Sequence, residues 1–475
     1  MVYSKSLLSV ATFLLGIAGV RAGCVVESGN YYCNEVSEVL FTNVGSSGSY
    51  NDITNMDTSS CTCSHTSKSY SGPLAPLDEE VSFHFRGPIH LKHFAVYNAD
   101  SSAAASFRKK RSLRNHPDLK KRDMVYVTEY VTEYINEDGS KYVDPASSTA
   151  LSDYVSSYIA SSSAAAATEA GDATTYATST VVSTASTETS DDYSSPSSSA
   201  TSFTTSTTTS SPSSSASSTK TSSTSASSGS GSGSWSRASY YEASSGTADN
   251  AVFLNNLGGS GSGVWSSCFG NSLSYAAADG VSCSSSSKTL NDVVVASNKE
   301  FSIWSSNKCD GDCGYYLPGI PAFHGFAGTK IVLFEFVMPH DYSSDYNQDM
   351  PAIWALNAKI GRTLQYGNAD CSCWTTGCGE FDIFEVLNSG NEKMIASIHS
   401  AQGAPSGSNT GGGGSSDYFA RPTSSSMIGA AIFDTVSSSI YVIDITDKGF
   451  SFGDSISTSD VENWFVDGAT VVQLN

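Results

Sequence analysis

Residues 147–234 form a long low-complexity tract of Ser and Thr with scattered Pro, and the tract ends in Gly-Ser repeats. Between Tyr193 and Ser236 the only charged residue is Lys220. Because such a segment lacks the apolar side chains that offset chain entropy through burial, we expect a disordered stalk that O-linked glycans extend. The tract excludes a single globule of 475 residues and leaves folded parts on both sides of it.

The charge of the chain limits its partners. The formal net charge is −21. Nucleic acids and anionic membranes attract surfaces rich in Lys and Arg, so this chain is poorly suited to either. We therefore expect no nucleic acid among the partners, whereas a neutral partner is compatible with the charge.

Residues 1–22 have the features of a secretory signal peptide. Lys5 supplies a positive start, residues 7–20 are mostly apolar, and Val20-Arg21-Ala22 fits a cleavage site. No later run approaches the ~18–20 apolar residues that a membrane span needs. We expect cleavage after Ala22 and a secreted product without a membrane span.

The cysteines agree with export. All 11 lie beyond residue 22, four in the N-terminal part and seven in the C-terminal part. An oxidising route favours structural disulfides, and no histidine lies at zinc-ligand spacing. We therefore expect neither a metal nor a cofactor, a disulfide-linked turn rather than a calcium site at Cys309-Asp-Gly-Asp-Cys313, and at least one thiol left over from an odd total.

The part before the Ser/Thr tract divides in two. Residues 23–100 are expected to form a small β-rich module with strands at 39–42, 81–85 and 89–97, at the lower size limit of independent folding. Residues 101–146 form a basic linker with the clusters Lys109-Lys110-Arg111 and Lys120-Lys121-Arg122. We expect a processing protease to cut after Lys121-Arg122; the alternative is a solvated charge run.

Residues 235–475 are expected to be the main folded domain. Gly, Ser, Asn and Asp separate many short apolar runs, and long helical periodicity is absent. This pattern predicts an all-β sandwich. We expect strands at residues 264–268, 301–304, 330–338, 352–356, 380–387, 394–399, 430–434, 439–446 and 449–453, and a flexible loop at 411–414.

Three carboxylates lie within six residues at Glu380, Asp382 and Glu385. In a strand, Glu380 and Asp382 share one face while Glu385 has the opposite parity, and a β-bulge near 383–384 would bring it back. The two glutamates would then flank one bond at ~5–5.5 Å, the separation used by retaining glycosidases, with Asp382 between them keeping their protonation states apart. The alternative is an acidic strand edge in an acidic protein.

These residues resemble the E-x-D-x-x-E signature of glycoside hydrolase family 16. Phe334-Glu-Phe-Val-Met-Pro339, Met350-Pro-Ala-Ile-Trp354 and Ile395-Ala-Ser-Ile-His399 are also similar to that family's flanking strands. The resemblance implies a jelly-roll, concanavalin-like β-sandwich with Glu380 as nucleophile, Asp382 as its assistant and Glu385 as general acid/base. It further implies that Trp354 lines the sugar cleft and that His399 lies near the carboxylates.

A cluster of cysteines precedes the nucleophile and departs from that family's pattern. Cys371, Cys373 and Cys378 surround Trp374. We expect them to hold the loop that enters the catalytic strand. Trp374 is then either a cap over a sugar subsite or a core side chain in a surface knot.

The whole chain resembles fungal cell-wall proteins described as probable circularly permuted β-1,3-glucanases. They share the signal peptide, the pattern at 83–97, the Ser/Thr-rich middle and this C-terminal domain. From Trp235, about 145 residues precede Glu380 but only 90 follow Glu385, which fits a permuted strand order. The strands missing after the motif would come from 235–307, from 83–97 or from both.

This resemblance implies an enzyme located in the cell wall that hydrolyses or remodels β-1,3-glucan with retention, so that β-1,3-glucan is its partner. The runner-up is a structural wall glycoprotein or glucan-binding module with a vestigial site. An adhesin displayed on a stalk is a third alternative. The C-terminal residues 470–475 do not resemble a hydrophobic anchor-attachment tail, which weakens that third reading.

Overall fold

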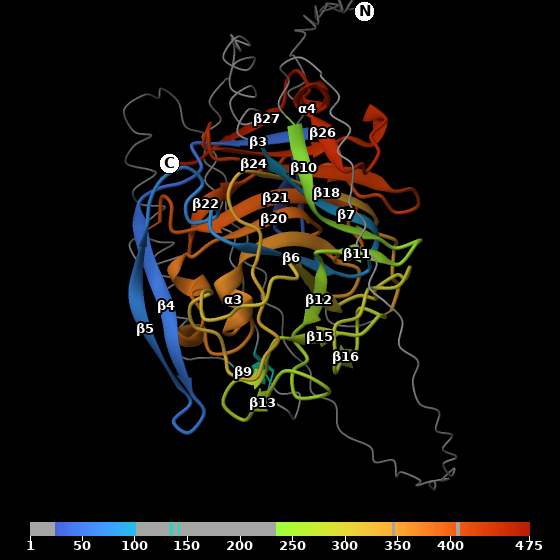
Figure 1. Ribbon diagram of the computed structural model, residues 1–475. Helices are drawn as coiled ribbons and strands as arrows, with labels where there is room; N and C mark the ends of the chain where they lie inside the picture. The colour runs from blue at the N-terminus through green and yellow to red at the C-terminus, as the bar shows by residue number, and fades with distance from the viewer. Residues whose placement is uncertain (1–23, 101–133, 136–140, 143–233, 344–346, 405–408) are drawn as a thin grey trace, which may run out of the picture. The chain divides into compact units, whose positions relative to one another are not determined.

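The computed structural model describes residues 24–100, 134–135, 141–142, 234–343, 347–404 and 409–475. The expected signal peptide, the Lys121-Arg122 processing site and nearly all of the Ser/Thr tract lie outside the described residues. Within the described part, strands dominate, and two large sheets carry most of them (Figure 1).

The first sheet has nine strands, and all of its pairs are antiparallel except β27 with β3. Its order is β11 (Thr247–Asp249), β10 (Ser234–Glu242), β7 (His90–Ala99), β18 (Lys330–Val337), β24 (Met427–Asp434), β25 (Ser439–Asp444), β3 (Glu38–Thr42) and β27 (Thr470–Gln473), with β26 (Ser455–Ser457) beside β10.

The second sheet has ten strands and carries the carboxylate motif near one end of its order. That order is β16 (Cys283–Ser284), β15 (Ser274–Ala276), β12 (Val252–Asn255), β17 (Glu300–Trp304), β6 (Val81–Arg86), β19 (Ala352–Asn357), β20 (Glu380–Glu385), β21 (Lys393–Ser400) and β22 (Gly411–Gly414), with β23 (Phe419–Ala420) beside β21.

The two sheets pack face to face over an aromatic core. Strand β6 shows why: its Val, Phe and Phe at 81, 83 and 85 alternate with polar residues and are fully buried in the shared core. Phe83 contacts Phe94 and Phe334 of the opposite sheet, and Phe381 of β20 contacts Phe433 of β24. The all-β sandwich predicted from the sequence is therefore confirmed.

The segment expected as a separate N-terminal module instead contributes strands to both sheets. Strand β6 lies between β17 and β19, whereas β7 lies between β10 and β18 and β3 between β25 and β27. Residues 24–100 and 234–475 accordingly belong to one compact unit. In Figure 1 the blue strands β3, β6 and β7 lie among green, orange and red ones. The physical reason is that the apolar faces of these strands lie in a core that they share with the C-terminal strands, as the contacts of Phe83 with Phe334 and of Phe41 with Phe381 show.

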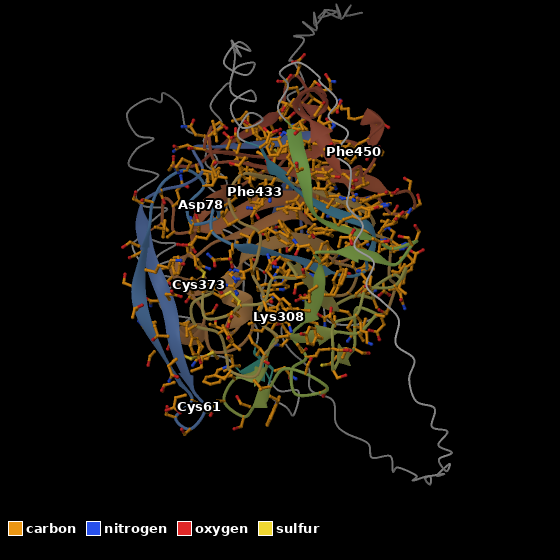
Figure 2. All side chains as sticks on the ribbon, viewed as in Figure 1. Cys61, Asp78, Lys308, Cys373, Phe433 and Phe450 are labelled. Atoms are coloured by element: carbon orange, nitrogen blue, oxygen red, sulfur yellow. A yellow bond between two sulfur atoms is a disulfide. The ribbon has the colours of Figure 1, made fainter. Side chains whose placement is uncertain are left out.

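Disulfides also cross from the N-terminal segment to the C-terminal part. Only Cys24–Cys33 is internal to residues 24–100, whereas Cys61 pairs with Cys268 and Cys63 with Cys371. Both crossing pairs start from the tip of a long hairpin, β4 (Gly48–Asp57) and β5 (Thr62–Tyr70), where Figure 2 labels Cys61. Cys309–Cys313 and Cys373–Cys378 are local, and Cys283 is the free thiol that the odd total requires.

The remaining described elements are short. Three further two-stranded pairs are β1 (Val25–Glu27) with β2 (Asn30–Tyr32), β13 (Trp265–Ser266) with β14 (Gly270–Asn271), and β8 (Tyr134–Ile135) with β9 (Lys141–Tyr142). The helices are α3 (Ala358–Arg362) and α4 (Thr458–Trp464), with 3-10 turns η1 (Ala369–Cys371), η2 (Trp374–Thr376) and η3 (Thr446–Lys448).

Two local expectations are wrong. Residues 449–453 contain no strand, because Gly449 caps η3 with a left-handed φ of 66° and the chain turns away. Gly411–Gly414 is not a loop but strand β22, paired with β21. A Cβ at Gly412 would lie 1.9 Å from the Ile398 carbonyl oxygen, so the glycine run is what permits this close pairing.

Candidate active site

The three carboxylates of β20 share the face of the ten-stranded sheet that points away from the other sheet. Phe381, Ile383 and Phe384 all belong to the core between the sheets, so the usual alternation is broken by one residue. The pairings of β20 with β19 and β21 both shift register at this point. This shift is the β-bulge expected from the parity of the motif, and it returns Glu385 to the face of Glu380 and Asp382.

Strand register aligns other side chains with the carboxylates. Asp382 of β20 lies opposite Trp354 of β19, which lies opposite His84 of β6. Glu385 lies opposite Ala352 of β19, which lies opposite Arg86 of β6, and Arg86 is in turn paired with Glu300 of β17. The site therefore consists of two rows of side chains that run across neighbouring strands. The first row is Asp382, Trp354 and His84, and the second runs from Glu385 through Ala352 and Arg86 to Glu300. The second row has a carboxylate at each end.

Glu380 is held by an indole. The Nε1 of Trp374 donates a hydrogen bond to Glu380 Oε2 at 2.5 Å. The Cys373–Cys378 disulfide closes the turn that carries Trp374, and Figure 2 labels Cys373 at this place. Burial and the neighbouring Asp382 raise the pKa of Glu380 to about 8, although this indole donor and His399 oppose the rise.

Asp382 lies between the glutamates and is held from strand β21. Ser397 Oγ donates to Asp382 Oδ2 at 2.9 Å, and His399 Nε2 lies 3.0 Å from the same oxygen. Burial alone would lower the pKa of His399, but the hydrogen bond and charge of Asp382 outweigh it and raise this pKa to about 9. A protonated His399 thus provides the positive partner of Asp382 near neutral pH.

Glu385 contacts a positive charge and has one unpaired oxygen. Arg86 Nη2 lies 3.4 Å from Glu385 Oε1. Glu385 Oε2 is buried and has no hydrogen-bond partner within the described part of the chain. Burial and Asp382 raise the pKa of Glu385 to about 7, and Arg86 opposes the rise. A buried carboxyl oxygen with no partner is costly unless a ligand provides one.

Trp354, expected to line the sugar cleft, is only 5% exposed. Its ring stacks on His84 with centroids 5.3 Å apart. Burial lowers the pKa of His84 to about 3, so this imidazole is neutral and contacts Ser82 Oγ at 2.8 Å. Trp354 therefore lies beside the carboxylates, mostly covered by the residues around it.

The structure thus brings all six residues expected from the sequence onto one face, from β19, β20, β21 and the turn before β20. Two glutamates with raised pKa values lie on either side of an aspartate, which is an arrangement suited to general acid/base and nucleophilic catalysis. Sequence reasoning missed His84, Arg86 and Glu300 as neighbours of this site. His84 and Arg86 lie within the 83–97 pattern, which was the available signal, whereas nothing in the sequence marks Glu300.

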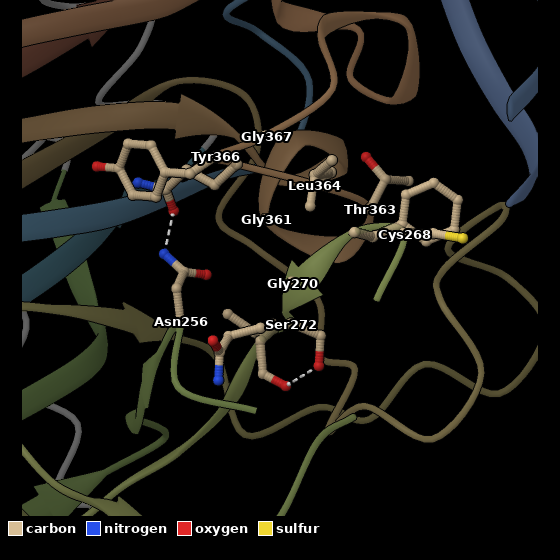
Figure 3. Close-up of a pocket in the computed structure, with 13 residues that line it drawn as sticks. Asn256, Cys268, Gly270, Ser272, Gly361, Thr363, Leu364, Tyr366 and Gly367 are labelled. Atoms are coloured by element: carbon tan, nitrogen blue, oxygen red, sulfur yellow. Dashed lines mark hydrogen bonds between the residues drawn. The ribbon is translucent and has the colours of Figure 1, made fainter. Parts of the chain in front are cut away.

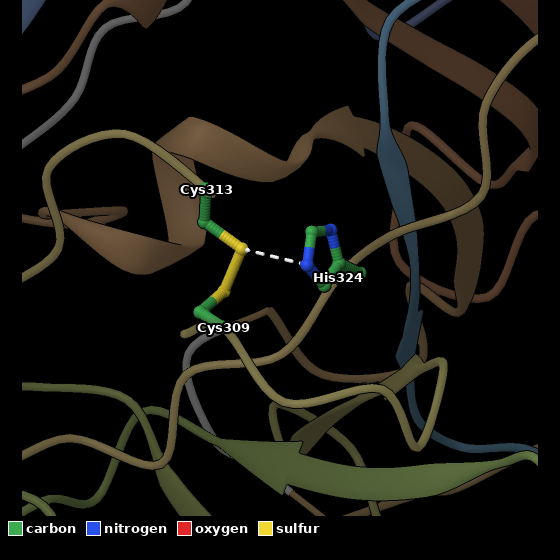
Figure 4. A group of neighbouring side chains, drawn as sticks. All are labelled: Cys309, Cys313 and His324. Carbon is green, nitrogen blue, oxygen red and sulfur yellow. Dashed lines mark hydrogen bonds between the residues drawn. A yellow bond between two sulfur atoms is a disulfide. The ribbon is translucent and has the colours of Figure 1, made fainter. Parts of the chain in front are cut away.

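A second group of potential ligands lies away from the carboxylates. Cys309, Cys313 and His324 offer ligand atoms within 4.8 Å of one another (Figure 4). The two sulfurs are joined in a disulfide, so they offer no thiolate, which is the form that binds metals. The other ring nitrogen of His324, Nδ1, contacts Glu80 Oε1 at 2.5 Å. The segment from Cys309 to Cys313 is therefore the disulfide-linked turn expected from the sequence.

No helix in the part of the chain that the structure describes is long and apolar enough to cross a bilayer.

Comparison with known proteins gives matches on both sides of the Ser/Thr tract. Two family models describe the cell-wall protein YJL171C/Tos1; the N-terminal model matches residues 37–99 and the C-terminal model matches residues 233–464. No solved structure matches the chain.

Curated relatives match over almost the full length. A probable circularly permuted 1,3-beta-glucanase of Schizosaccharomyces pombe is 56% identical and covers 99% of both chains. TOS1 of Candida albicans is 43% identical over 98% of this chain and 99% of its own, and TOS1 of Saccharomyces cerevisiae is 43% identical over 96% and 95%. Both TOS1 proteins are also named probable circularly permuted 1,3-beta-glucanases. This chain belongs to the YJL171C/Tos1 family of cell-wall proteins.

Proposed function

We propose that this protein is an exported cell-wall enzyme that hydrolyses or remodels β-1,3-glucan with retention of anomeric configuration. The observation that carries the proposal is the pair Glu380 and Glu385, which share one face, have raised pKa values and lie on either side of Asp382. The names of the curated relatives supply the substrate class. The negative charge of the chain is compatible with a neutral polymer.

The two glutamates titrate as a coupled pair with raised pKa values, about 8 for Glu380 and about 7 for Glu385, so the pair retains a proton near neutral pH. In the free site the higher pKa belongs to Glu380, and we propose that binding of substrate moves the shared proton to Glu385. The short indole hydrogen bond favours the carboxylate form of Glu380. Oε2 of Glu385 has no hydrogen-bond partner within the described part of the chain. A proton on this oxygen can therefore be donated to the glycosidic oxygen of a bound substrate.

The first chemical step forms a covalent glycosyl-enzyme. A Glu380 oxygen attacks the anomeric carbon, the bond from that carbon to the glycosidic oxygen breaks, and Glu385 transfers its proton to the leaving oxygen. Arg86 then neutralises the carboxylate that Glu385 has become. Asp382 and the protonated His399 hold a fixed charge pair between the two reacting glutamates.

The second step reverses these roles. Glu385 removes a proton from water or from a sugar hydroxyl, whose oxygen attacks the anomeric carbon and releases Glu380 as a carboxylate. Water gives hydrolysis, and a sugar hydroxyl gives transfer. Both outcomes restore Glu385 to its protonated form and retain the anomeric configuration.

The test replaces each glutamate and supplies azide with laminarin or laminari-oligosaccharides. Glu380→Gln should lose essentially all turnover and keep its fold by circular dichroism. Glu380→Ala with azide should give the α-glycosyl azide, and Glu385→Ala the β-glycosyl azide. Glu392→Gln is the matched control, because the Glu392 side chain is 70% exposed and lies outside the rows described above.

Retained activity of Glu380→Gln on laminarin would exclude the assignment of Glu380 as nucleophile. Binding of laminari-oligosaccharides by the unaltered protein without any product would instead support a glucan-binding wall glycoprotein. Product anomers followed by proton NMR immediately after mixing distinguish retention from inversion.

A further inference from the structure

A pocket of about 440 Å³ lies between two loop regions at the side of the ten-stranded sheet (Figure 3). One wall comes from residues 268–273, which include β14, and the other from residues 361–367, which follow the start of α3. Asn256, from the chain just after β12, completes the lining. The volume lies within the range of small-molecule sites in proteins.

The lining of this pocket contains no charged side chain, although the chain as a whole carries a net charge of −21. Its polar side chains are the amides of Asn256, Asn271 and Gln365 and the hydroxyls of Ser272 and Thr363. Asn256 Nδ2 donates to Gln365 Oε1 at 2.8 Å and joins the two walls. Neutral donors and acceptors of this kind suit a neutral ligand rich in hydroxyl groups rather than a phosphate, a carboxylate or a metal ion.

Tyr366 connects the pocket to the catalytic rows. Tyr366 is one of the residues that line the pocket, and its hydroxyl donates to Glu300 Oε2 at 2.6 Å. Glu300 is paired with Arg86, and Arg86 reaches Glu385 across β19. Three strand spacings separate Glu300 from Glu385, which is about 14 Å. A chain of sugar rings lying across β20, β19, β6 and β17 would therefore arrive at Tyr366.

Two exposed aromatic side chains mark the rim of this region. Tyr366 is 55% exposed, and Trp265, whose strand β13 pairs with Asn271 of β14, is 57% exposed. All six tryptophans of the chain lie in described residues, and the other five are buried or half-buried. The Cys61–Cys268 disulfide links the β13–β14 pair to the β4–β5 hairpin. Aromatic faces held in place in this way offer a large contact area to a ligand ring.

We propose that this pocket binds glucosyl units of the same β-glucan chain that Glu380 and Glu385 cleave, with Tyr366 as the stacking platform and Asn256, Asn271 and Gln365 as hydrogen-bonding groups. The inference rests on the proposed function and extends it. The pocket makes the enzyme favour longer chains, because only a chain that spans β19, β6 and β17 reaches both the carboxylates and Tyr366.

The experiment compares kcat/KM for laminari-oligosaccharides of increasing length, from three to eight glucose units, in the full chain. Tyr366→Ala should lower the ratio of long-chain to short-chain kcat/KM about tenfold, which corresponds to about 1.4 kcal/mol of lost contact energy. Tyr366→Phe removes the hydrogen bond to Glu300 but keeps the ring, and it should retain most of this ratio. Tyr342→Ala is the control, because Tyr342 is 86% exposed and does not line the pocket.

A direct binding measurement separates the two proposals. Titration of laminarihexaose into Glu380→Gln, followed by calorimetry, should show weaker binding after Tyr366→Ala or Asn271→Ala is added. If the unaltered protein cleaves laminari-oligosaccharides and the Tyr366→Ala variant keeps its length dependence and affinity, the pocket assignment is overturned alone. If the unaltered protein neither binds nor cleaves them, both proposals are overturned.

Discussion

Arg86 Nη2 lies 3.4 Å from Glu385 Oε1, although the two residues are 299 positions apart in the sequence. Arg86 belongs to β6, in the segment before the Ser/Thr tract, and Glu385 ends β20, well after it. The Nε of Arg86 also donates to the Met350 carbonyl oxygen at 2.7 Å, which fixes the guanidinium in place. The charge environment of the proposed acid/base thus depends on both ends of the chain.

The first prediction concerns this ion pair. Arg86 opposes the rise in the pKa of Glu385, which stands at about 7, so Arg86→Met should raise that pKa further. A general acid with a higher pKa keeps its proton to higher pH, and the alkaline limb of kcat/KM should move upward by roughly one pH unit. The measurement is kcat/KM against pH on laminarin.

The matched control is Arg86→Lys, which keeps the positive charge and should leave the alkaline limb closer to its original position. Thermal unfolding of both variants separates a fold defect from an electrostatic effect. An unchanged alkaline limb in a folded Arg86→Met variant would contradict the role assigned to Arg86.

A second prediction concerns the indole that holds Glu380. Trp374→Phe removes the donor of the 2.5 Å hydrogen bond and should raise the pKa of Glu380, because that bond favours the ionised carboxylate. A nucleophile must be ionised, so the acidic limb of the pH profile should move upward. A hydrogen bond to a charged group contributes about 1.5–3 kcal/mol, which corresponds to roughly a 10- to 150-fold loss in kcat/KM.

The control for this prediction is Thr375→Ala, which changes the same 3-10 turn without touching Glu380. A Trp374→Phe enzyme with the pH profile of the unaltered protein would show that the indole is a packing residue only.

The sequence was informative where the pattern is local. The parity of Glu380, Asp382 and Glu385 sufficed to predict the bulge, because phenylalanine and isoleucine at 381 and 383 must enter the core. The strands around Trp354 and His399 are likewise predicted, from short apolar runs separated by turn residues.

The rest depends on contacts that no local pattern records. Gly411–Gly414 has no side chains to mark a face, and only its pairing with β21 makes it a strand. The partners of Cys61 and Cys63 lie 207 and 308 positions away, across the tract that appeared to divide the chain. For the same reason β6 and β7 looked like parts of a separate module, although they complete sheets whose other strands come much later.

A third prediction follows from the two disulfides that join the segments on either side of the Ser/Thr tract. A specific protease site inserted within residues 147–234 and then cut should give two fragments that run together without reductant and separate with it. The nicked protein should keep its activity, because β6 and β7 are interior strands and the two disulfides from Cys61 and Cys63 remain. The measurements are denaturing gels with and without reductant and turnover on laminarin.

The comparison is a double variant, Cys61→Ser with Cys63→Ser. After the same cut, its fragments should separate in a denaturing gel without reductant but elute together in native size exclusion. Loss of activity on nicking of the disulfide-bonded protein would contradict the integration of β6 and β7 into the catalytic unit.

The last prediction is that Glu380 and Glu385, the proposed catalytic carboxyls, make the folded protein less stable as the pH rises. In the folded protein the pKa values of Glu380 and Glu385 stand at about 8 and about 7, above the ordinary value of 4.5 expected after unfolding. Between about pH 4.5 and pH 8 the folded state therefore holds more protons than the unfolded state, so the free energy of unfolding falls as pH rises through this window. The double variant Glu380→Gln with Glu385→Gln should reduce this fall to the part that the raised pKa of His399 contributes, and should gain on the order of a few kcal/mol over the unaltered protein at pH 8 relative to pH 5. Urea unfolding at both pH values measures the difference; a gain that is equal at the two pH values would mean that the pair is not protonated in the folded protein.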